Sequence, residues 1–571
     1  MLTTSGALRQ HDTVNTMDSV DDDEDPVQVP AHVSTRKYPK EYSQIERNDE
    51  NALIFQRRTV DGFYIANFSP QGHFMKHGHV QTIWGSQYLQ EALRMLLFDI
   101  PIIILRLLTL NTALWAAIRP KLRYLYSGRA WARENYLRSY WQTIDHETLM
   151  LDILLHDRNC GADAPPSASE IAHVEACVSF EYVTTWKTRK SHPTSPDRGR
   201  ATVDRSSTRP VTIIVHGLEN HSRSPQVLGL ARWSYSKGFD VFALNHRGCA
   251  AMDYDGLKQI QRILEDDTVF DYHGGFVDDL LYVSQIIRLR RPKAKIYVSG
   301  YSLGGNIVAK FLGVLGHKAS EFNVHGGFGL CVPFDEETSN LDANLFNRTF
   351  YVPGLLLSLK FKAGLKLLGR VYRRWNRFGR PRVFRLEDER KQESLADPDL
   401  PRSPSLPALL EPVYHHVTDF LSPLTRRLAE NAEDLGQLRG MMRADKLGGF
   451  IENYSSPIWG FANPQTFYDE NASWRFFHRI RVPFLVVNSY DDPFFLAEKY
   501  PIVRDLELQG ANAELGGPTV LPPVRLAYTE YGGHCGFIRH FYDHIWDSWV
   551  YRASATYLAY LYDAGTMFDI D

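Results

Sequence analysis

Ser302 stands where a serine side chain can be made reactive. It is the centre of Gly300-Tyr301-Ser302-Leu303-Gly304, which follows a β-rich run and precedes a helical run, Asn306–Leu312. In this G-x-S-x-G pattern a sharp turn strains the serine backbone, and the flanking glycines let strand and helix approach closely. The motif alone is weak, since a glycine-rich turn without chemistry can match it by chance. Its place between a strand and a helix predicts a nucleophile at Ser302.

A serine hydroxyl is a poor nucleophile at neutral pH, so a histidine must accept its proton. The chain has 21 histidines. In folds that carry a serine on such a turn, the nucleophile comes first in the chain, then the acid and then the base, which lies on a loop after the last strand. His534 follows the β-rich run Val524–Thr529, within Gly532-Gly533-His534-Cys535-Gly536. The glycines allow a loop that brings the imidazole to the serine. This predicts His534 as the general base, with a structural loop histidine as the alternative.

The acid that orients the histidine should follow the preceding strand. After Phe484–Val487 the chain reads Asn488-Ser489-Tyr490-Asp491-Asp492-Pro493-Phe494-Phe495, so two carboxylates compete. An acid followed by any residue and then two apolar residues favours Asp492, which leaves Asp491 to cap the turn by accepting backbone N–H bonds. A carboxylate on the far ring nitrogen selects the histidine tautomer and stabilises the imidazolium. Asp492 is the predicted acid, and Asp491 remains open.

Two backbone N–H groups are needed to stabilise the oxyanion that such a reaction forms. The first is the amide of Leu303, directly after the nucleophile. The second should lie just past the strand Val211–Val215, where the chain continues His216-Gly217-Leu218, and Leu218 is the predicted donor. Metal binding is the functional alternative for His216, but no partner stands at metal-ligand spacing, so a structural role in the loop is favoured.

Short β-rich runs alternate with helical stretches along the chain. This alternation predicts an α/β fold with a mostly parallel central sheet flanked by helices. The chemically interesting residues follow directly after strand ends, which is where sites lie in such sheets. The predicted strands are Val211–Val215, Asp240–Leu244, Lys295–Val298, Phe484–Val487 and Val524–Tyr528.

Composition excludes several classes of protein. The 571 residues carry a formal net charge of −3, and no basic repeat interleaved with aromatics occurs, so nucleic-acid binding is not expected. The five cysteines are widely spaced and lack a C-x-x-C pair; neither a disulfide framework nor a metal site is indicated, and no cofactor is predicted. The N-terminus carries the acidic run Asp21–Asp25 and no basic, apolar leader, so we expect an intracellular protein without a secretory signal.

Changes in composition divide the chain into five predicted segments. Residues 1–50 are acidic and lack apolar periodicity, which predicts a disordered tail. The interval between residues 302 and 492 is far longer than one helix and one strand require, so an insertion should form a cap over the site. The segments are the tail 1–50, an N-terminal extension 51–175, a first core part 176–334, a cap 335–480 with a disordered loop 378–407, and a second core part 481–571.

Two segments could contact a membrane. The stretch 92–122 is apolar, but charges interrupt it, and its longest uncharged run, Leu107–Ile118, is too short to span a bilayer. A buried helix pair and an interfacial or re-entrant membrane contact both fit it, and a true span remains open. The stretch 355–375 is basic and amphipathic, which suits an anionic membrane surface or a lid over the site. An ordinary cap helix with a solvated basic face fits equally well. We predict membrane association and leave the oligomeric state open.

Several segments together resemble the YheT-like branch of the α/β-hydrolases, which includes the eukaryotic hydrolase-domain lipases. The resemblance covers most of residues 75–550, in the expected order, and implies that Ser302, Asp492 and His534 are nucleophile, acid and base. The stretch from about 88 to 130 looks inserted relative to this branch. The matching segments are Gly78–Trp84, His216–Glu219, Asn245–Cys249, Tyr272–Asp279, Gly300–Asn306, Asp491–Pro493 and Gly532–His534.

The resemblance implies a serine hydrolase that cleaves carboxylic esters, with a lipid or small ester as substrate. An apolar cap favours a fatty acyl chain over a sugar or a peptide. His534 is not followed by the aspartate, five positions on, that marks acyltransferase-like relatives, so hydrolysis is favoured over acyl transfer. The alternatives are a binding protein that has kept the fold and lost turnover, and an acyltransferase or thioesterase.

Overall fold

The computed structural model describes residues 56–58, 62–64, 68–71, 76–84, 131–132, 135–145, 147–158, 160–177, 205–249, 272–335, 339–376, 432–501, 523–539 and 548–568. All of them belong to the unit Tyr38–Asp571. The predicted tail 1–50, the apolar stretch 92–122, the loop 378–407 and most of the loop 187–210 lie outside these residues.

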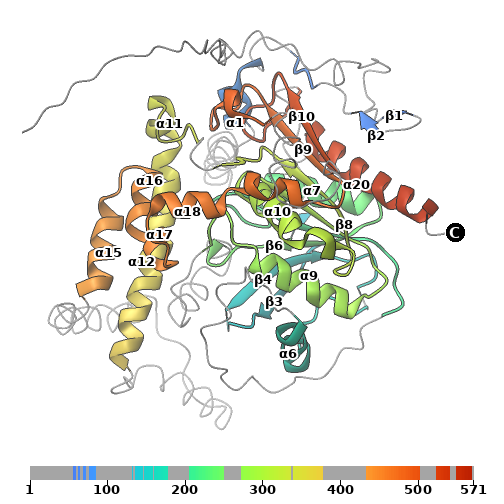
Figure 1. Cartoon of the computed structure of the whole chain (residues 1–571), viewed down its shortest axis with the longest axis horizontal. Coiled ribbons are helices and arrows are strands. Elements are labelled where there is room, and N and C mark those ends of the chain that lie inside the picture. The colour runs from blue at the N-terminus through green and yellow to red at the C-terminus, as the bar shows by residue number, and fades with distance from the viewer. Residues whose placement is uncertain are drawn as a thin grey trace, which may run out of the picture. The chain divides into compact units, whose positions relative to one another are not determined.

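An eight-stranded sheet forms the centre of the described unit, in the order β10-β9-β8-β7-β5-β6-β4-β3 (Figure 1). The six strands from β10 to β6 are parallel, and β4 and β3 continue the sheet antiparallel. The strands are β3 (Leu137–Gln142), β4 (Thr148–Leu154), β5 (Val211–Val215), β6 (Asp240–Leu244), β7 (Ile296–Tyr301), β8 (Val324–Leu330), β9 (Phe484–Ser489) and β10 (Val524–Thr529). A separate two-stranded hairpin pairs β1 (Gln56–Arg58) with β2 (Gly62–Tyr64).

The predicted fold class is confirmed, and the sheet is larger than predicted. All five expected strands are present, and β7, β9 and β10 each run one to three residues further than expected. Strands β3, β4 and β8 were not predicted from the sequence. Because β3 and β4 lie within the predicted N-terminal extension 51–175 and pair into the sheet, the core begins well before residue 176.

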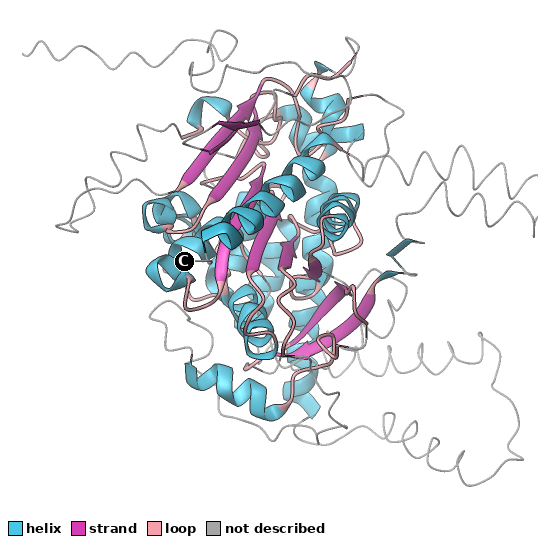
Figure 2. Ribbon diagram, turned by 90° about the vertical axis from the view of Figure 1, so that its right-hand side faces the viewer, coloured by secondary structure: helices cyan, strands magenta, loops and turns pink. Residues whose placement is uncertain are grey.

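Helices cover both faces of the sheet (Figure 2). Successive residues of a strand point to opposite faces: at Gly326 of β8 a Cβ would meet Leu561, and at Gly327 it would meet Leu312. Leu561 belongs to α20 and Leu312 to α10, so these two helices lie on opposite faces. The helices around the sheet are α1 (Gly78–Trp84), α6 (Ala168–Cys177), α7 (Pro225–Ser236), α9 (Asp278–Arg290), α10 (Leu303–Leu315) and α20 (Trp549–Phe568).

The segment predicted as a cap is helical and has a core of its own. Its buried residues include Val352, Leu359, Met441 and Phe450. The predicted helix 355–375 is confirmed within α12. Two of its three lysines, Lys362 and Lys366, are buried, so these two do not belong to a solvated basic face. The cap helices are α11 (Leu345–Phe350), α12 (Val352–Asn376), α15 (Ala432–Arg443), α16 (Leu447–Phe450), α17 (Ser456–Ile458) and α18 (Pro464–Asn471). The segment η11 (Ser473–Arg479) leads back to the sheet and packs on α10.

One buried cation ties three parts of the core together. Arg247, after β6, is fully buried, and its guanidinium donates to Asp145 between β3 and β4 and to Asp279 at the start of α9, each at 2.6 Å. The ring of Phe276 covers it, 4.8 Å from the guanidinium carbon. Burial alone lowers the pKa of Arg247, but the two carboxylates hold it well above its usual value. The guanidinium therefore stays charged, and its two carboxylate partners fix the loop after β6.

Replacing this cation should unfold the protein more easily. Arg247→Met leaves two carboxylates buried without a counter-charge, so the free energy of unfolding should fall by about 3–5 kcal/mol in urea titrations. The matched variant Arg247→Met/Asp145→Asn/Asp279→Asn removes the stranded charges and should recover part of the loss. A single variant as stable as the wild type would show that the cluster contributes nothing.

Candidate active site

The predicted nucleophile lies on a strained turn between β7 and α10. Ser302 has φ 52° and ψ −127°, a conformation that an L residue adopts only when its surroundings enforce it. The Ser302 N–H donates to the carbonyl of Leu330 in β8, and the Ser302 carbonyl accepts from Asn306 N–H in α10. These bonds fix the turn from both sides, so the serine stands at the carboxyl end of the central strand.

Glycine is required on both sides of Ser302. A Cβ on Gly300 would lie 2.3 Å from the carbonyl oxygen of Gly304, and a Cβ on Gly304 would lie 2.3 Å from that of Val215. Both contacts are with backbone, which cannot move aside cheaply. The G-x-S-x-G spacing is therefore explained by close approach of the helix start to β7 and β5.

The three residues predicted as nucleophile, base and acid are in one hydrogen-bonded chain. The Oγ of Ser302 lies 2.8 Å from Nε2 of His534, and Nδ1 of His534 lies 2.9 Å from Oδ2 of Asp492. The Asp492 side chain is fully buried, and the ring of Phe494 stacks on the imidazole at 4.2 Å between centroids. The residues come from three loops far apart in sequence, and the sheet brings those loops together.

Burial and charge act in opposite directions on the histidine. Desolvation lowers the pKa of His534, but the carboxylate of Asp492 raises it by more, so the pKa lies above the ordinary histidine value. A stronger base is more easily protonated by the serine hydroxyl, and the carboxylate stabilises the imidazolium that results.

The two neighbouring aspartates have different partners. Asp492 binds the imidazole through Oδ2 and caps its own turn through Oδ1, which accepts from Phe494 N–H at 2.8 Å. Asp491 does not cap that turn. It accepts from Gly533 N–H at 2.8 Å and so ties its loop to the histidine loop. Burial raises the pKa of Asp491 to about 6.

Helix α1 holds the histidine loop in place by hydrogen bonds, a role that was not predicted from the sequence. The Oγ1 of Thr82 accepts from His534 N–H at 2.7 Å, and the amide side chain of Gln81 exchanges two 2.8 Å hydrogen bonds with the backbone of Ile538. Gln81 is fully buried. Gly78–Trp84 was one of the segments that resemble the YheT-like branch. Its contacts with the histidine loop become visible only in the fold.

The predicted oxyanion residues flank the serine. Leu303 begins α10, and the segment from Gly217 to Glu219 runs beside the nucleophile, since a Cβ on Gly217 would lie 3.1 Å from Ser302 Cβ. Leu218 lines the same cavity as Ser302. The roles of the Leu218 and Leu303 amides remain predictions.

His216, weighed above as a metal ligand, is engaged on both ring nitrogens. Its Nδ1 donates to the carbonyl of Gly217 at 2.7 Å, and its Nε2 accepts from His246 N–H at 3.0 Å. Burial lowers the pKa of His216 well below the ordinary value. A neutral, doubly bonded imidazole suits the structural role and leaves no lone pair for a metal.

A cap lysine reaches the oxyanion segment. Lys362 of α12 forms a buried ion pair with Glu219, which lies one residue after Leu218 and has φ 54°. Tyr272 joins them, because its hydroxyl accepts from Glu219 N–H at 2.8 Å and donates to the Glu219 carboxylate at 2.9 Å. The position of the cap is thus linked to the loop that faces the nucleophile.

A cavity of about 930 Å³ lies between cap and core, over the serine. Ser302, His534 and Leu218 line its base. Half of the remaining lining residues come from the cap, and its apolar members include Leu341, Phe350, Leu355, Leu359 and Phe450. A cavity of this size lies within the range of small-molecule binding sites.

The sheet order and the serine turn define the α/β-hydrolase fold. A family model described as serine aminopeptidase, S33, matches residues 206–349. The chain is 22% identical to a monoacylglycerol lipase of Saccharomyces cerevisiae, over 60% of this chain and 58% of that protein. It is 23% identical to the putative esterase YheT of Escherichia coli, over 58% of this chain and 71% of that protein. Among solved structures, the esterase Pf2001 of Pyrococcus furiosus aligns with 75% of this chain and 92% of its own, at 10% identity and a TM-score of 0.30.

These comparisons confirm the branch to which the sequence motifs pointed. The chain is similar to the YheT-like branch of the α/β-hydrolases, among proteins named as lipases and esterases. It spans less than two thirds of the length of the yeast relative.

Exchanging each aspartate for asparagine should separate their roles. Asp492→Asn removes the charge that orients and stabilises the imidazolium, so ester turnover should fall by roughly 10⁴-fold. Because the pKa of His534 also falls, the acidic limb of the kcat/KM profile should move to lower pH. Asp491→Asn keeps an acceptor for Gly533 N–H and should retain most turnover. The reverse ranking in a pH-rate series would make Asp491 the acid.

The raised pKa of Asp491 also predicts a pH-dependent stability. Its folded pKa of about 6 exceeds the unfolded value, so its contribution to stability is present at low pH and is lost as pH rises through 6. Asp491→Asn removes this loss. The variant should be more stable than wild type by about 2–3 kcal/mol at pH 8, and equally stable at pH 4, in urea unfolding. Equal stability at both pH values would contradict the assignment.

Proposed function

We propose that this protein is a serine hydrolase that cleaves carboxylic esters of fatty acyl lipids. The observation that carries the proposal is the hydrogen-bonded chain Ser302–His534–Asp492, set on a strained serine turn at the base of an apolar cavity. Relatives named monoacylglycerol lipase and esterase support the same class of substrate.

The proposed reaction begins when Ser302 Oγ attacks the ester carbonyl carbon. Its proton passes to Nε2 of His534, and the Leu303 and Leu218 amides donate to the oxyanion. The imidazolium, stabilised by Asp492, then protonates the alcohol oxygen, which leaves with its bonding electrons. The acyl group remains on Ser302 until His534 activates a water molecule to hydrolyse it.

The wall of the cavity supports a long acyl chain. Leu355 and Leu359 of α12 line it, together with Phe450 and Phe467. Such a wall binds methylene groups by removing them from water, at about 0.8 kcal/mol for each group buried. In this proposal the ester carbonyl lies at Ser302 and the acyl chain extends toward the cap.

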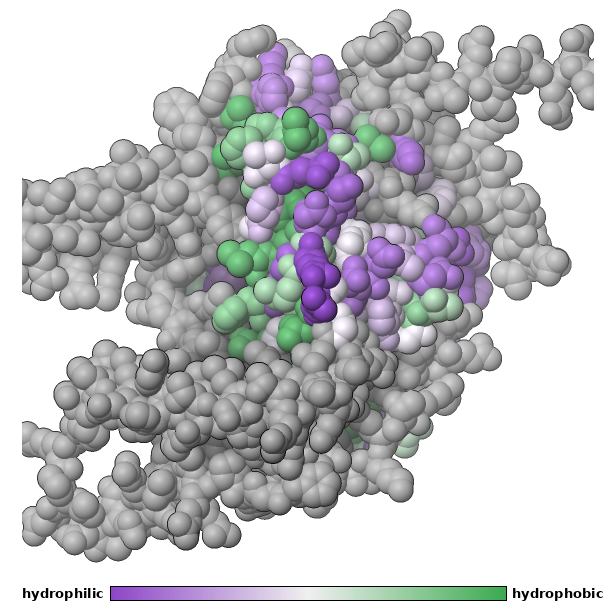
Figure 3. Space-filling model, turned by 90° about the vertical axis from the view of Figure 1, so that its left-hand side faces the viewer, coloured by the Kyte–Doolittle hydropathy of each residue, from purple (hydrophilic) through white to green (hydrophobic). Residues whose placement is uncertain are grey.

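We also propose that the cap contacts a membrane surface. Leu345, Phe350 and Leu357 are exposed by 77%, 65% and 73%, on α11 and α12. Figure 3 views the side of the molecule that carries these helices, where apolar residues lie beside hydrophilic ones. Exposed apolar side chains on neighbouring helices suit contact with a lipid layer, and Phe350 also lines the cavity. Among the described residues, no helix is long and apolar enough to cross a membrane.

A fluorophosphonate probe tests the hydrolase directly. The probe should label the purified wild type, and turnover of a fatty acyl ester panel should accompany labelling. Ser302→Ala should abolish labelling and lower turnover by more than about 10³-fold, and His534→Ala should lower both. Ser284→Ala, whose hydroxyl bonds only within α9 at Leu281, is the matched serine control and should behave as wild type. A folded wild type with neither labelling nor turnover would refute the proposed activity.

A further inference from the structure

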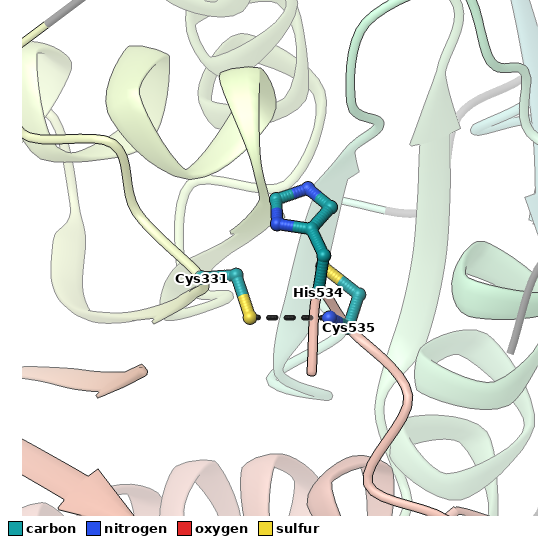
Figure 4. A group of neighbouring side chains, drawn as sticks. All are labelled: Cys331, His534 and Cys535. Atoms are coloured by element: carbon teal, nitrogen blue, oxygen red, sulfur yellow. Dashed lines mark hydrogen bonds between the residues drawn. The ribbon is translucent and has the colours of Figure 1, made fainter. Parts of the chain in front are cut away.

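Two cysteine thiols lie directly beside the proposed base. Cys331 follows β8 and Cys535 follows His534 in the histidine loop, and both are buried. One sulfur from each cysteine and one ring nitrogen of His534 all lie within 4.8 Å of one another (Figure 4). The proposed reaction uses neither thiol. They are about 200 positions apart in the chain, so no short sequence motif for metal ligands includes both.

Backbone contacts hold the two sulfurs in place. Cys535 N–H donates to Sγ of Cys331 at 3.2 Å, and the Cys331 thiol donates to the carbonyl of Gly533 at 3.7 Å. The Cys331 N–H is itself bonded to Val487 in β9 at 2.8 Å. The possible metal ligands therefore come from two loops that are already bonded to each other. Less conformational entropy is lost when such preorganised side chains bind an ion.

The spacing is close to what a thiophilic d¹⁰ cation needs. With Zn–S near 2.3 Å and Zn–N near 2.0–2.1 Å, the donors of a tetrahedral zinc ion lie about 3.5–3.8 Å apart. Side-chain rotations that move each ligand atom by about 1 Å or less would bring the two sulfurs and the nitrogen to this spacing around one ion. His534 and Cys535 both line the cavity, so an ion can reach them from the substrate side.

We propose that Cys331, Cys535 and His534 form an inhibitory site for Zn²⁺ or a similar thiophilic cation. Binding would exchange two S–H protons, released to solvent, for two S–Zn bonds, and one imidazole lone pair would make the third bond. Water completes the coordination. Each ring nitrogen of His534 already serves the triad, one toward Ser302 and the other toward Asp492. Whichever nitrogen binds the ion, a triad hydrogen bond breaks, and turnover stops.

Cation binding can be measured without turnover. In phosphine-reduced Ser302→Ala protein, titration with Cd²⁺ should produce the ultraviolet thiolate-to-metal charge-transfer band with one ion per chain at this site. Cys331→Ala and Cys535→Ala should each lose that band. Cys160→Ala removes a buried thiol outside the cluster and is the matched control that should keep it. An unchanged band in both cluster variants, in protein that unfolds at the wild-type urea concentration, overturns the site.

Inhibition by Zn²⁺ rests on the proposed function and is measured separately. Zn²⁺ should lower ester turnover of the wild type at least tenfold, and a chelator should restore it. The ratio of turnover with and without Zn²⁺ should return toward one in each cluster variant and stay low in Cys160→Ala. A Cys331–Cys535 disulfide in peptides of the treated protein would mean oxidation and would overturn ligation. A Cd²⁺ band without any ester turnover would refute the hydrolase and leave the metal site standing.

Discussion

The site depends on backbone contacts at Gly304 that leave no room for a side chain. A Cβ there would lie 2.3 Å from the carbonyl of Val215 and 2.5 Å from that of His216, so α10 begins against the end of β5. This contact places Ser302 in its strained conformation and brings Leu303 beside the Gly217 segment. The strained turn costs of order 1–3 kcal/mol. The hydrogen bonds between β7 and its parallel neighbours must offset this energy.

Residues whose role follows from local geometry could be predicted from sequence. Ser302 and His534 each follow a strand and stand between glycines, and the fold restricts their order along the chain. Strands with branched apolar residues, such as Val211–Val215, were found with their bounds. The missed strand β8 contains three glycines, which weaken any β signal. The fold needs one of them at Gly327, where a Cβ would crowd Leu312.

Contacts between distant segments could not be predicted, because no local pattern encodes them. Lys362 looked like part of a basic, solvent-facing surface, yet it lies buried against Glu219. Asp491 and Asp492 are adjacent in sequence and both contact the histidine loop, but Asp491 accepts from the Gly533 backbone and Asp492 binds the His534 imidazole. The approach of Cys331 to Cys535 depends on how β8 and the histidine loop meet. In each case the sequence shows the chemistry of the side chain but does not show which residue it contacts.

Helix α1 gives the molecule a particular order of assembly during synthesis. Gln81 is made early, and the backbone of Ile538 that satisfies its buried amide follows 457 residues later. Closing so long a loop is slow and costs entropy. A nascent chain held on the ribosome can therefore complete the turn at Ser302 well before it can seat His534. The hydrogen-bonded chain Ser302–His534–Asp492 therefore cannot form until the histidine loop has been made and has packed against α1.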